Sequence, residues 1–220
     1  MSKKSIKITC LCDSIFFAEI PTSIDLGGEP EYIEKITNGT FLNFVCPSCK
    51  KKHKPEFSMI IAWPEHNVRF DIIPELERGE YGRSKKEKPN SKEKIKTEKI
   101  IGYPELAERI LVHRDGMEPT AVEAIKYFLH LKAEENYPGT NIDVWYTGLN
   151  PESLEFHIHG IKKDEVAVMK VPSATYAKTL ADYRNNPKNE LFSALRDGSY
   201  VSVRNITMKN RHNSRFSYRI

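Results

Sequence analysis

Four cysteines, grouped in two close pairs, constrain the fold of this chain more than any other feature of its sequence. The first pair is Cys10-Leu11-Cys12 and the second is Cys46-Pro47-Ser48-Cys49. Four thiolates in two pairs are the donor set of a closed tetrahedral Zn²⁺ site, which leaves no position open for a substrate water. The sequence therefore predicts a structural zinc site with the ligands Cys10, Cys12, Cys46 and Cys49.

The two pairs match the usual geometry of a zinc knuckle to different degrees. Pro47 fixes a turn in the second pair that directs both sulfurs toward one ion. The first pair lacks the proline and one spacer residue, but residues i and i+2 of an extended strand face the same side. His53 is a candidate replacement ligand, and its alternative interpretation is a surface histidine in the basic run 50–54. Free thiols without metal and a functional disulfide are the alternatives to zinc.

The hydrophobic pattern predicts an α+β fold with three parts. Residues 1–76 read as a β-rich, zinc-ribbon-like part with a short helix at 30–36, and residues 77–99 as a basic mobile loop or linker with few apolar side chains. Residues 100–220 read as an α+β part: a helical hairpin, then an antiparallel or mixed sheet with two short helices. The expected strands of the first part are 6–9, 15–20, 41–45, 56–63 and 67–73.

The pattern of the last part is more detailed. Pro104 and Pro119 suit the first turns of the two helices of the hairpin. Further helices are expected at 173–183 and 187–196, and strands at 142–147, 154–161, 166–171 and 200–206. The strand at 166–171 is apolar on both faces, which is typical of a central strand.

The formal net charge of +4 is concentrated in two segments. Residues 83–99 and 204–220 each carry a local charge of +5, so the rest of the chain is mildly acidic at −6. This distribution excludes a uniformly basic nucleic-acid-binding face. The two segments are nevertheless candidate nucleic-acid contacts, because basic side chains release phosphate counterions; the alternative is a solvated loop and a closing strand. The candidate contacts are Arg83, Lys85, Lys86, Lys209, Arg211 and Arg215.

A second candidate site lies on the expected strand 154–161. Glu155, His157 and His159 share one face, and two histidines with a carboxylate can bind a metal. The alternative is the polar face of a half-buried strand, which explains the same alternation without any chemistry. A metal-dependent hydrolase or transferase using this sheet is therefore one alternative function.

The sequence also bears on compartment and reaction class. There is no N-terminal apolar segment of a secretory signal and no apolar run of membrane-spanning length, so we expect a cytoplasmic protein without a membrane partner. No nucleophile elbow, Walker A loop, dinucleotide fingerprint or H-E-x-x-H motif occurs, and no catalytic residue is nominated.

The paired cysteines and four further stretches resemble a known family. Residues 8–12, 17–25 and 43–49, with the stretches 105–111, 115–117 and 122–126 of the expected helical part, are similar to CpXC-domain proteins, a bacterial and archaeal group named for two Cys-Pro-x-Cys motifs. The resemblance implies a metal-stabilised module, and it implies no reaction because the family is functionally uncharacterised. The first motif departs from the family pattern, since Cys10-Leu11-Cys12 has neither the proline nor the second spacer.

These observations favour a non-catalytic, intracellular zinc-binding module that mediates interactions with a protein partner. Zn²⁺ would be structural, held by the four cysteines. A nucleic-acid-associated protein using the basic loop and tail, and a metal-dependent enzyme using the C-terminal sheet, are the alternatives.

Overall fold

The computed structural model describes residues 3–83 and 95–207. The chain divides into two compact units, Met1–Ile110 and Leu111–Ile220. Both units combine helices with β-strands, which confirms the predicted α+β class. None of the described helices is long and apolar enough to cross a membrane.

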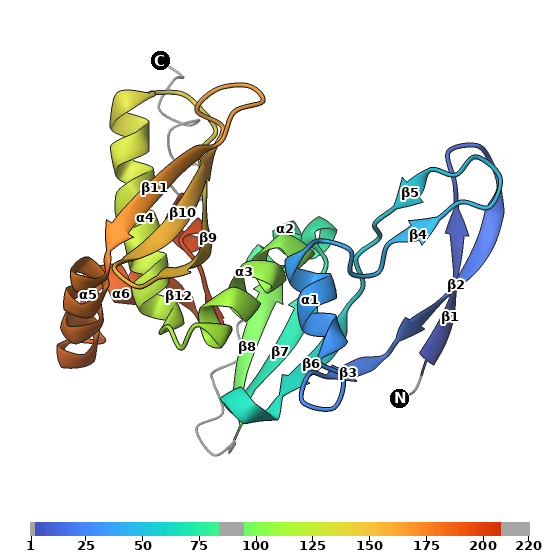
Figure 1. Ribbon diagram of the computed structural model, residues 1–220, viewed down its shortest axis with the longest axis horizontal. Helices are drawn as coiled ribbons and strands as arrows, with labels where there is room; N and C mark the ends of the chain where they lie inside the picture. Colours follow the sequence, from blue (N-terminus) through green and yellow to red (C-terminus); the bar gives the residue numbers. More distant parts are fainter. Residues whose placement is uncertain (1–2, 84–94, 208–220) are drawn as a thin grey trace. The chain divides into compact units, whose positions relative to one another are not determined.

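The first unit contains two β-hairpins (Figure 1). The four cysteines lie in the turns of these hairpins. Both hairpins are antiparallel. The first one forms because its residues alternate: Ile8, Ala18 and Ile20 are buried on one face, while the opposite face is exposed. The strands of the two hairpins are β1 (Lys3–Thr9) with β2 (Ile15–Pro21), and β4 (Phe44–Val45) with β5 (Lys52–His53).

The core of the first unit is a sheet whose inner face packs against two helices. Phe70, Ile61 and Ile72 of the sheet are fully buried and form one cluster with Leu106 and Ile110 of α3 (Tyr103–Arg114). A second helix, α1 (Glu31–Thr37), adds Ile36 to this cluster. In the order in which they pair, the strands of the sheet are β8 (Lys96–Ile101), β7 (Val68–Ile73), β6 (Met59–Trp63) and β3 (Ser23–Asp25).

The expected hairpin at 56–73 is confirmed, and its turn has a clear physical cause. β6 and β7 pair antiparallel through the short 3-10 helix η1 (Pro64–His66). Asn67 then reverses the chain with a left-handed backbone, φ 53°, a conformation that asparagine tolerates better than most residues. The expected strand at 41–45 is shorter, because Leu42 is also left-handed, φ 47°, and Phe41 turns into the core.

The segment expected to be a basic linker is partly ordered, which corrects that prediction at both of its ends. After the 3-10 helix η2 (Glu75–Glu77), residues up to Arg83 form the helix α2 (Arg78–Arg83), and the segment closes with β8. Glu98 on β8 is buried and binds Arg109 of α3 at 3.1 Å. The charge of this segment predicts a loop, yet a charged residue can be buried when it is paired. Residues 84–94 lie outside the described part.

The second unit packs a three-stranded sheet against a long helix. Tyr146, Leu154 and Phe156 are fully buried in the sheet and cluster with Val122 and Ile125 of α4. The sheet has the order β11-β10-β9. The elements are α4 (Pro119–Asn136), β9 (Asp143–Asn150), β10 (Ser153–His159), β11 (Ala167–Pro172), α5 (Ser173–Asn185), α6 (Glu190–Ala194), β12 (Arg196–Asp197) and β13 (Tyr200–Val201).

Two expectations for this unit are wrong. The strand expected to be central is β11, which lies at the edge of its sheet and is mostly exposed. Its apolar character reflects partial cover at Met169 and Val171, which pack on the core from the edge. The strand expected at 200–206 ends at Val201, and Val203 packs instead against Phe192 and Leu195.

Candidate metal centre

The first pair of cysteines lies in the turn that joins β1 to β2. Cys10 follows the last residue of β1, and its N–H donates to the carbonyl of Ser14 at 2.9 Å. The N–H of Asp13 donates back to the carbonyl of Cys10 at 3.0 Å, and Asp13 takes a left-handed backbone, φ 60°. This tight turn lets a pair with only one spacer residue direct both thiols to the same place.

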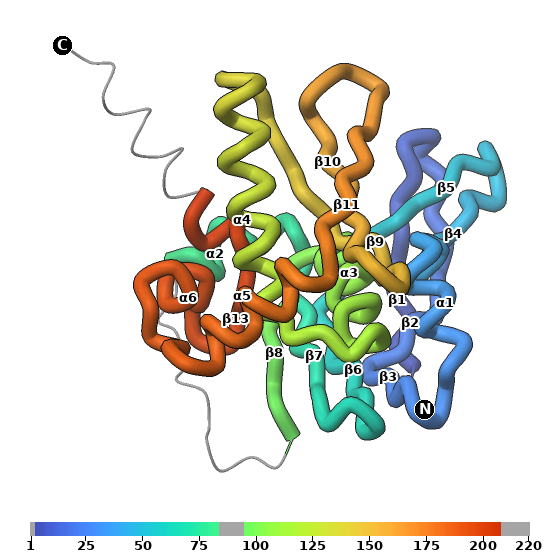
Figure 2. The backbone as a smooth tube through the Cα atoms, turned by 60° about the vertical axis from the view of Figure 1, so that its left-hand side comes forward, coloured from blue at the N-terminus to red at the C-terminus, as the bar shows by residue number. Residues whose placement is uncertain are grey.

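The second pair lies in the turn that joins β4 to β5. The N–H of Cys46 donates to the carbonyl of Lys51 at 2.9 Å, and the N–H of Lys50 donates to the carbonyl of Cys46 at 3.1 Å. Lys50 is left-handed, φ 61°, a conformation that glycine adopts with less strain. Both views of the backbone place this turn beside the β1–β2 turn (Figure 1, Figure 2).

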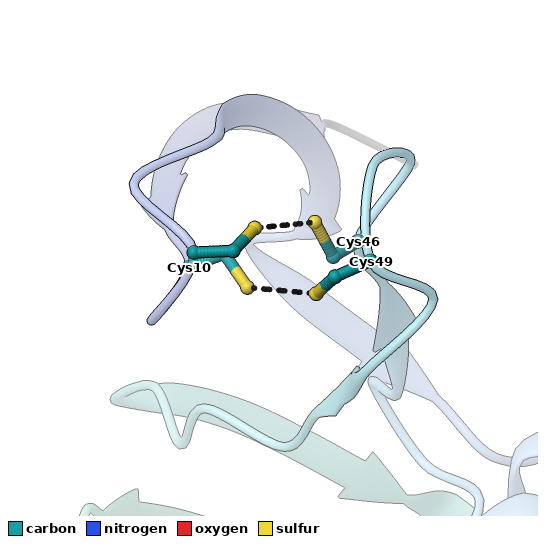
Figure 3. Close-up of side chains that lie close together, drawn as sticks. Cys10, Cys46 and Cys49 are labelled. Atoms are coloured by element: carbon teal, nitrogen blue, oxygen red, sulfur yellow. Dashed lines mark hydrogen bonds between the residues drawn. The ribbon is translucent and has the colours of Figure 1, made fainter.

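The turns bring all four sulfur atoms into one cluster (Figure 3). The Sγ atoms of Cys10 and Cys49 are 3.4 Å apart, those of Cys12 and Cys46 are 3.7 Å apart, and all four lie within 4.8 Å of one another. Zn–S bonds of about 2.3 Å in a tetrahedron require S–S separations of about 3.8 Å. The donor set and its spacing therefore fit a tetrahedral thiophilic cation, and none of the four cysteines forms a disulfide.

The protonation of the cluster is uneven because its four thiols are crowded. Cys10 and Cys46 are buried, whereas Cys12 and Cys49 lie nearer the surface. A backbone hydrogen bond at Cys12 lowers the pKa of Cys10, but burial and the neighbouring thiols outweigh it and the net shift is upward. The backbone N–H groups of Cys49 and Ser48 stabilise the thiolate of Cys46 and lower its pKa. A bound cation would have to expel the proton from Cys10.

His53, the candidate replacement ligand, lies next to the cluster. Its Nε2 atom is 3.2 Å from the Sγ atom of Cys10, and its ring packs edge-on against Phe16 with centroids 5.8 Å apart. Within the described part of the chain, the group of side chains close enough to share one ion consists of the four cysteines and does not include His53. This position suits a hydrogen-bond donor that steadies the sulfur of Cys10 from outside the ligand set.

Replacing His53 by alanine is therefore expected to weaken zinc binding without removing it. Loss of an outer partner of a ligand typically lowers metal affinity about 10- to 100-fold. Competition with a chromophoric chelator would measure the affinity, and the absorption spectrum of the Co²⁺-substituted protein would report the ligand set. An unchanged spectrum is expected; a spectrum that shifts on His53→Ala would mean that histidine nitrogen replaces one of the sulfurs.

Sequence reasoning missed a contact that joins the two turns. The hydroxyl of Ser48 donates to the hydroxyl of Ser14 at 2.9 Å, across 34 positions of sequence. No sequence signal identifies the pair, because serine is common in every turn.

The second candidate site on β10 is more open. The Nε2 atom of His157 is 3.5 Å from Oε1 of Glu155, and both side chains are about one-third exposed, at 36% and 30%. The rings of His157 and His159 are 6.5 Å apart, and His159 is exposed. These residues share a face as predicted, but they are not among the described groups whose ligand atoms converge on one point.

Most of the candidate nucleic-acid contacts cannot be placed. Arg83 is the exposed last residue of α2. Arg204, in the basic tail, contacts Asp143 at 3.2 Å within the second unit. The remaining candidates lie outside the described residues, namely Lys85, Lys86, Lys209, Arg211 and Arg215.

Comparison with known proteins adds a family and one relative. The model of the CpXC protein family matches residues 8–126, which include all four cysteines and the helices α1 and α3. An uncharacterised protein of Treponema pallidum (strain Nichols) is 27% identical over 216 residues, covering 91% of this chain and 98% of the relative. No solved structure matches the chain significantly.

Proposed function

Because the chain belongs to the CpXC family, we propose that it is a non-catalytic, zinc-stabilised module that mediates protein interactions in the cytoplasm. The observation that carries this proposal is the convergence of four cysteine sulfurs from two hairpins within 4.8 Å. Cys10, Cys12, Cys46 and Cys49 are the ligands in this proposal, and Zn²⁺ has a structural role.

Zinc fits this donor set better than other common metals. Thiolates exclude magnesium and calcium, which prefer oxygen donors, and a cluster of four sulfurs in a tetrahedral arrangement is typical of zinc or iron. Pairs of cysteines on two facing hairpins are the arrangement of zinc ribbons. Four reduced thiols also suit a reducing compartment, which is why we place the protein in the cytoplasm.

A structural role follows from coordination chemistry. Four thiolates saturate a tetrahedral ion, so no position stays open for a water or a substrate. The two hairpins are also too small to bury a core of their own: β4 and β5 have two residues each. An isolated hairpin is marginally stable in water, so a metal that ties two of them together stabilises both.

An interaction role is supported by the surface next to the cysteines. Leu11, between the first two ligands, is 88% exposed, and Phe17 on the outer face of β2 is 71% exposed. A hairpin held rigid by a metal can present such side chains at little entropic cost on binding.

The proposal is tested by the metal content of untagged, full-length protein purified under reducing conditions. Native mass spectrometry is expected to show one zinc ion per chain, and the four thiols are expected to resist alkylation until a chelator is added. A protein without metal whose four thiols react freely would contradict the proposal. A protein with iron in place of zinc, identified by its colour and mass, would keep the site but change the metal.

A further inference from the structure

One long edge of the first hairpin has no partner strand in the described part of the chain. β1 spans Lys3–Thr9 and pairs with β2 alone in a two-stranded sheet. Seven residues are enough for a full strand to add. A free strand edge carries N–H and C=O groups that can pair with the backbone of another chain.

The hydrogen bonding of the hairpin fixes which groups face outward. The N–H of Cys10 points across the hairpin to Ser14, in register with the β1–β2 pairs. Backbone groups alternate in direction along a strand, so those of Ser5, Lys7 and Thr9 point away from β2. Lys3 lies in the same phase, opposite Pro21, so its backbone groups also point away from β2.

A groove runs along this edge. It has a volume of about 660 Å³ and is lined by the six consecutive residues 4–9 of β1 together with Pro55 and Phe57. Pro55 has no N–H, and the chain from Lys54 to Ser58 forms no strand, so this segment does not compete for the edge of β1. Ile6 and Phe57 give the groove partly buried apolar side chains.

The positive charge along the edge of β1 indicates which kind of strand can pair with it. β1 has exposed lysines at positions 3, 4 and 7 and no acidic residue. Pairing of β1 with β1 of a second copy would set these lysines against one another, and lysines on an edge strand oppose such pairing. A strand with carboxylates beside Lys7 and apolar side chains toward Ile6 would instead satisfy both the charge and the groove.

We propose that the free edge of β1 binds an extended acidic segment of a partner protein by strand addition. The segment alternates apolar and acidic residues, donates and accepts hydrogen bonds with Ser5, Lys7 and Thr9, and places its apolar side chains in the groove beside Phe57. This proposal rests on the proposed function, since it names the partner that the zinc-held hairpin receives.

The test uses the full-length zinc-loaded protein and a fluorescent heptapeptide of alternating valine and glutamate. Anisotropy is expected to show saturable binding of this peptide, and no binding of a matched valine–lysine peptide or of the glutamate peptide methylated on every backbone nitrogen, which leaves neither edge able to donate hydrogen bonds. Ser5→Pro, which removes one outward N–H but no β1–β2 bond, is expected to weaken binding about tenfold, whereas Ser5→Ala leaves it unchanged.

A charge reversal provides a second, independent variant. The Lys7→Glu variant is expected to bind the valine–lysine peptide and no longer to bind the glutamate peptide, with an unchanged zinc content. Strand addition would be overturned if the methylated and unmethylated glutamate peptides bound equally well. It would also be overturned if Lys7→Glu and Ser5→Pro both bound the glutamate peptide as well as the wild type does, or if the protein dimerised through β1 and bound no peptide. Measuring zinc on the same samples distinguishes the failure of strand addition from the failure of the proposed zinc-stabilised module. A zinc-loaded protein that does not bind the peptide would refute only the strand addition.

Discussion

Replacing Cys49 by serine is expected to abolish zinc binding and to unfold the two hairpins of the first unit while the second unit stays folded. Binding of structural zinc contributes on the order of 10 kcal/mol to the folding of small sites. The hairpins have little else to hold them, because Cys46 and Ile8 are among their few buried side chains. Serine keeps the size of the side chain but is a poor zinc ligand.

Hydrogen exchange followed by mass spectrometry is the measurement that resolves this result by segment. Amides of β1, β2, β4 and β5 are expected to lose protection in Cys49→Ser, and those of β9 and β10 to keep it. Ser48→Ala is the matched control, since it removes only the hydroxyl contact with Ser14 and should keep the zinc. A Cys49→Ser protein with the zinc content and exchange pattern of the wild type would rule out the structural role.

Replacing Arg109 by methionine is expected to lower the free energy of unfolding of the first unit by about 3–5 kcal/mol. Arg109 and Glu98 are both almost fully buried, with side chains 7% and 3% exposed, and their charged groups are 3.1 Å apart. Without the guanidinium of Arg109, the buried carboxylate of Glu98 retains its ion pair with Lys96, whose Nζ atom is 2.8 Å from Oε1, but the side chain of Lys96 is 56% exposed. Its ammonium group is largely solvated and compensates only weakly.

The double variant Glu98→Leu with Arg109→Met separates the loss of a partner from the loss of the pair. Replacing both charges by apolar groups is expected to recover most of the stability, because the desolvation of the two charges is removed together. Urea unfolding of the first unit can be monitored by the fluorescence of Trp63, which is buried in its core. A Trp145→Phe background removes the signal of the other tryptophan. A double variant as unstable as Arg109→Met would show that lost packing, and not the loss of the Glu98–Arg109 ion pair, dominates.

Local patterns were enough to predict most of the elements. The β6–β7 hairpin follows from two apolar runs that flank Pro64, and α4 begins at Pro119 as expected. Two of the errors have a common cause, which is that burial is decided by tertiary neighbours. β11 is apolar but lies at an edge, and β8 begins in a segment whose charge suggested a loop, because Arg109 on a helix neutralises Glu98.

The sequence by itself determined the chemistry of the candidate site. Two close pairs of cysteines specify four soft donors, and this conclusion needs no coordinates because ligand type depends on residue type alone. The short spacing of Cys10 and Cys12 left their geometry open. Only the tertiary structure decided it, because the distance between Cys10 and Cys49 depends on how two hairpins far apart in sequence lie against each other.

The same distinction holds for the surroundings of the cysteines. The sequence showed a histidine near the second pair, but only the fold placed Nε2 of His53 3.2 Å from Sγ of Cys10 and outside the cluster of four sulfurs. The sequence also showed that β1 is rich in lysine. Whether an edge is paired depends on the strand that lies next to it, so only the structure showed that the outer edge of β1 has no partner strand among the described residues.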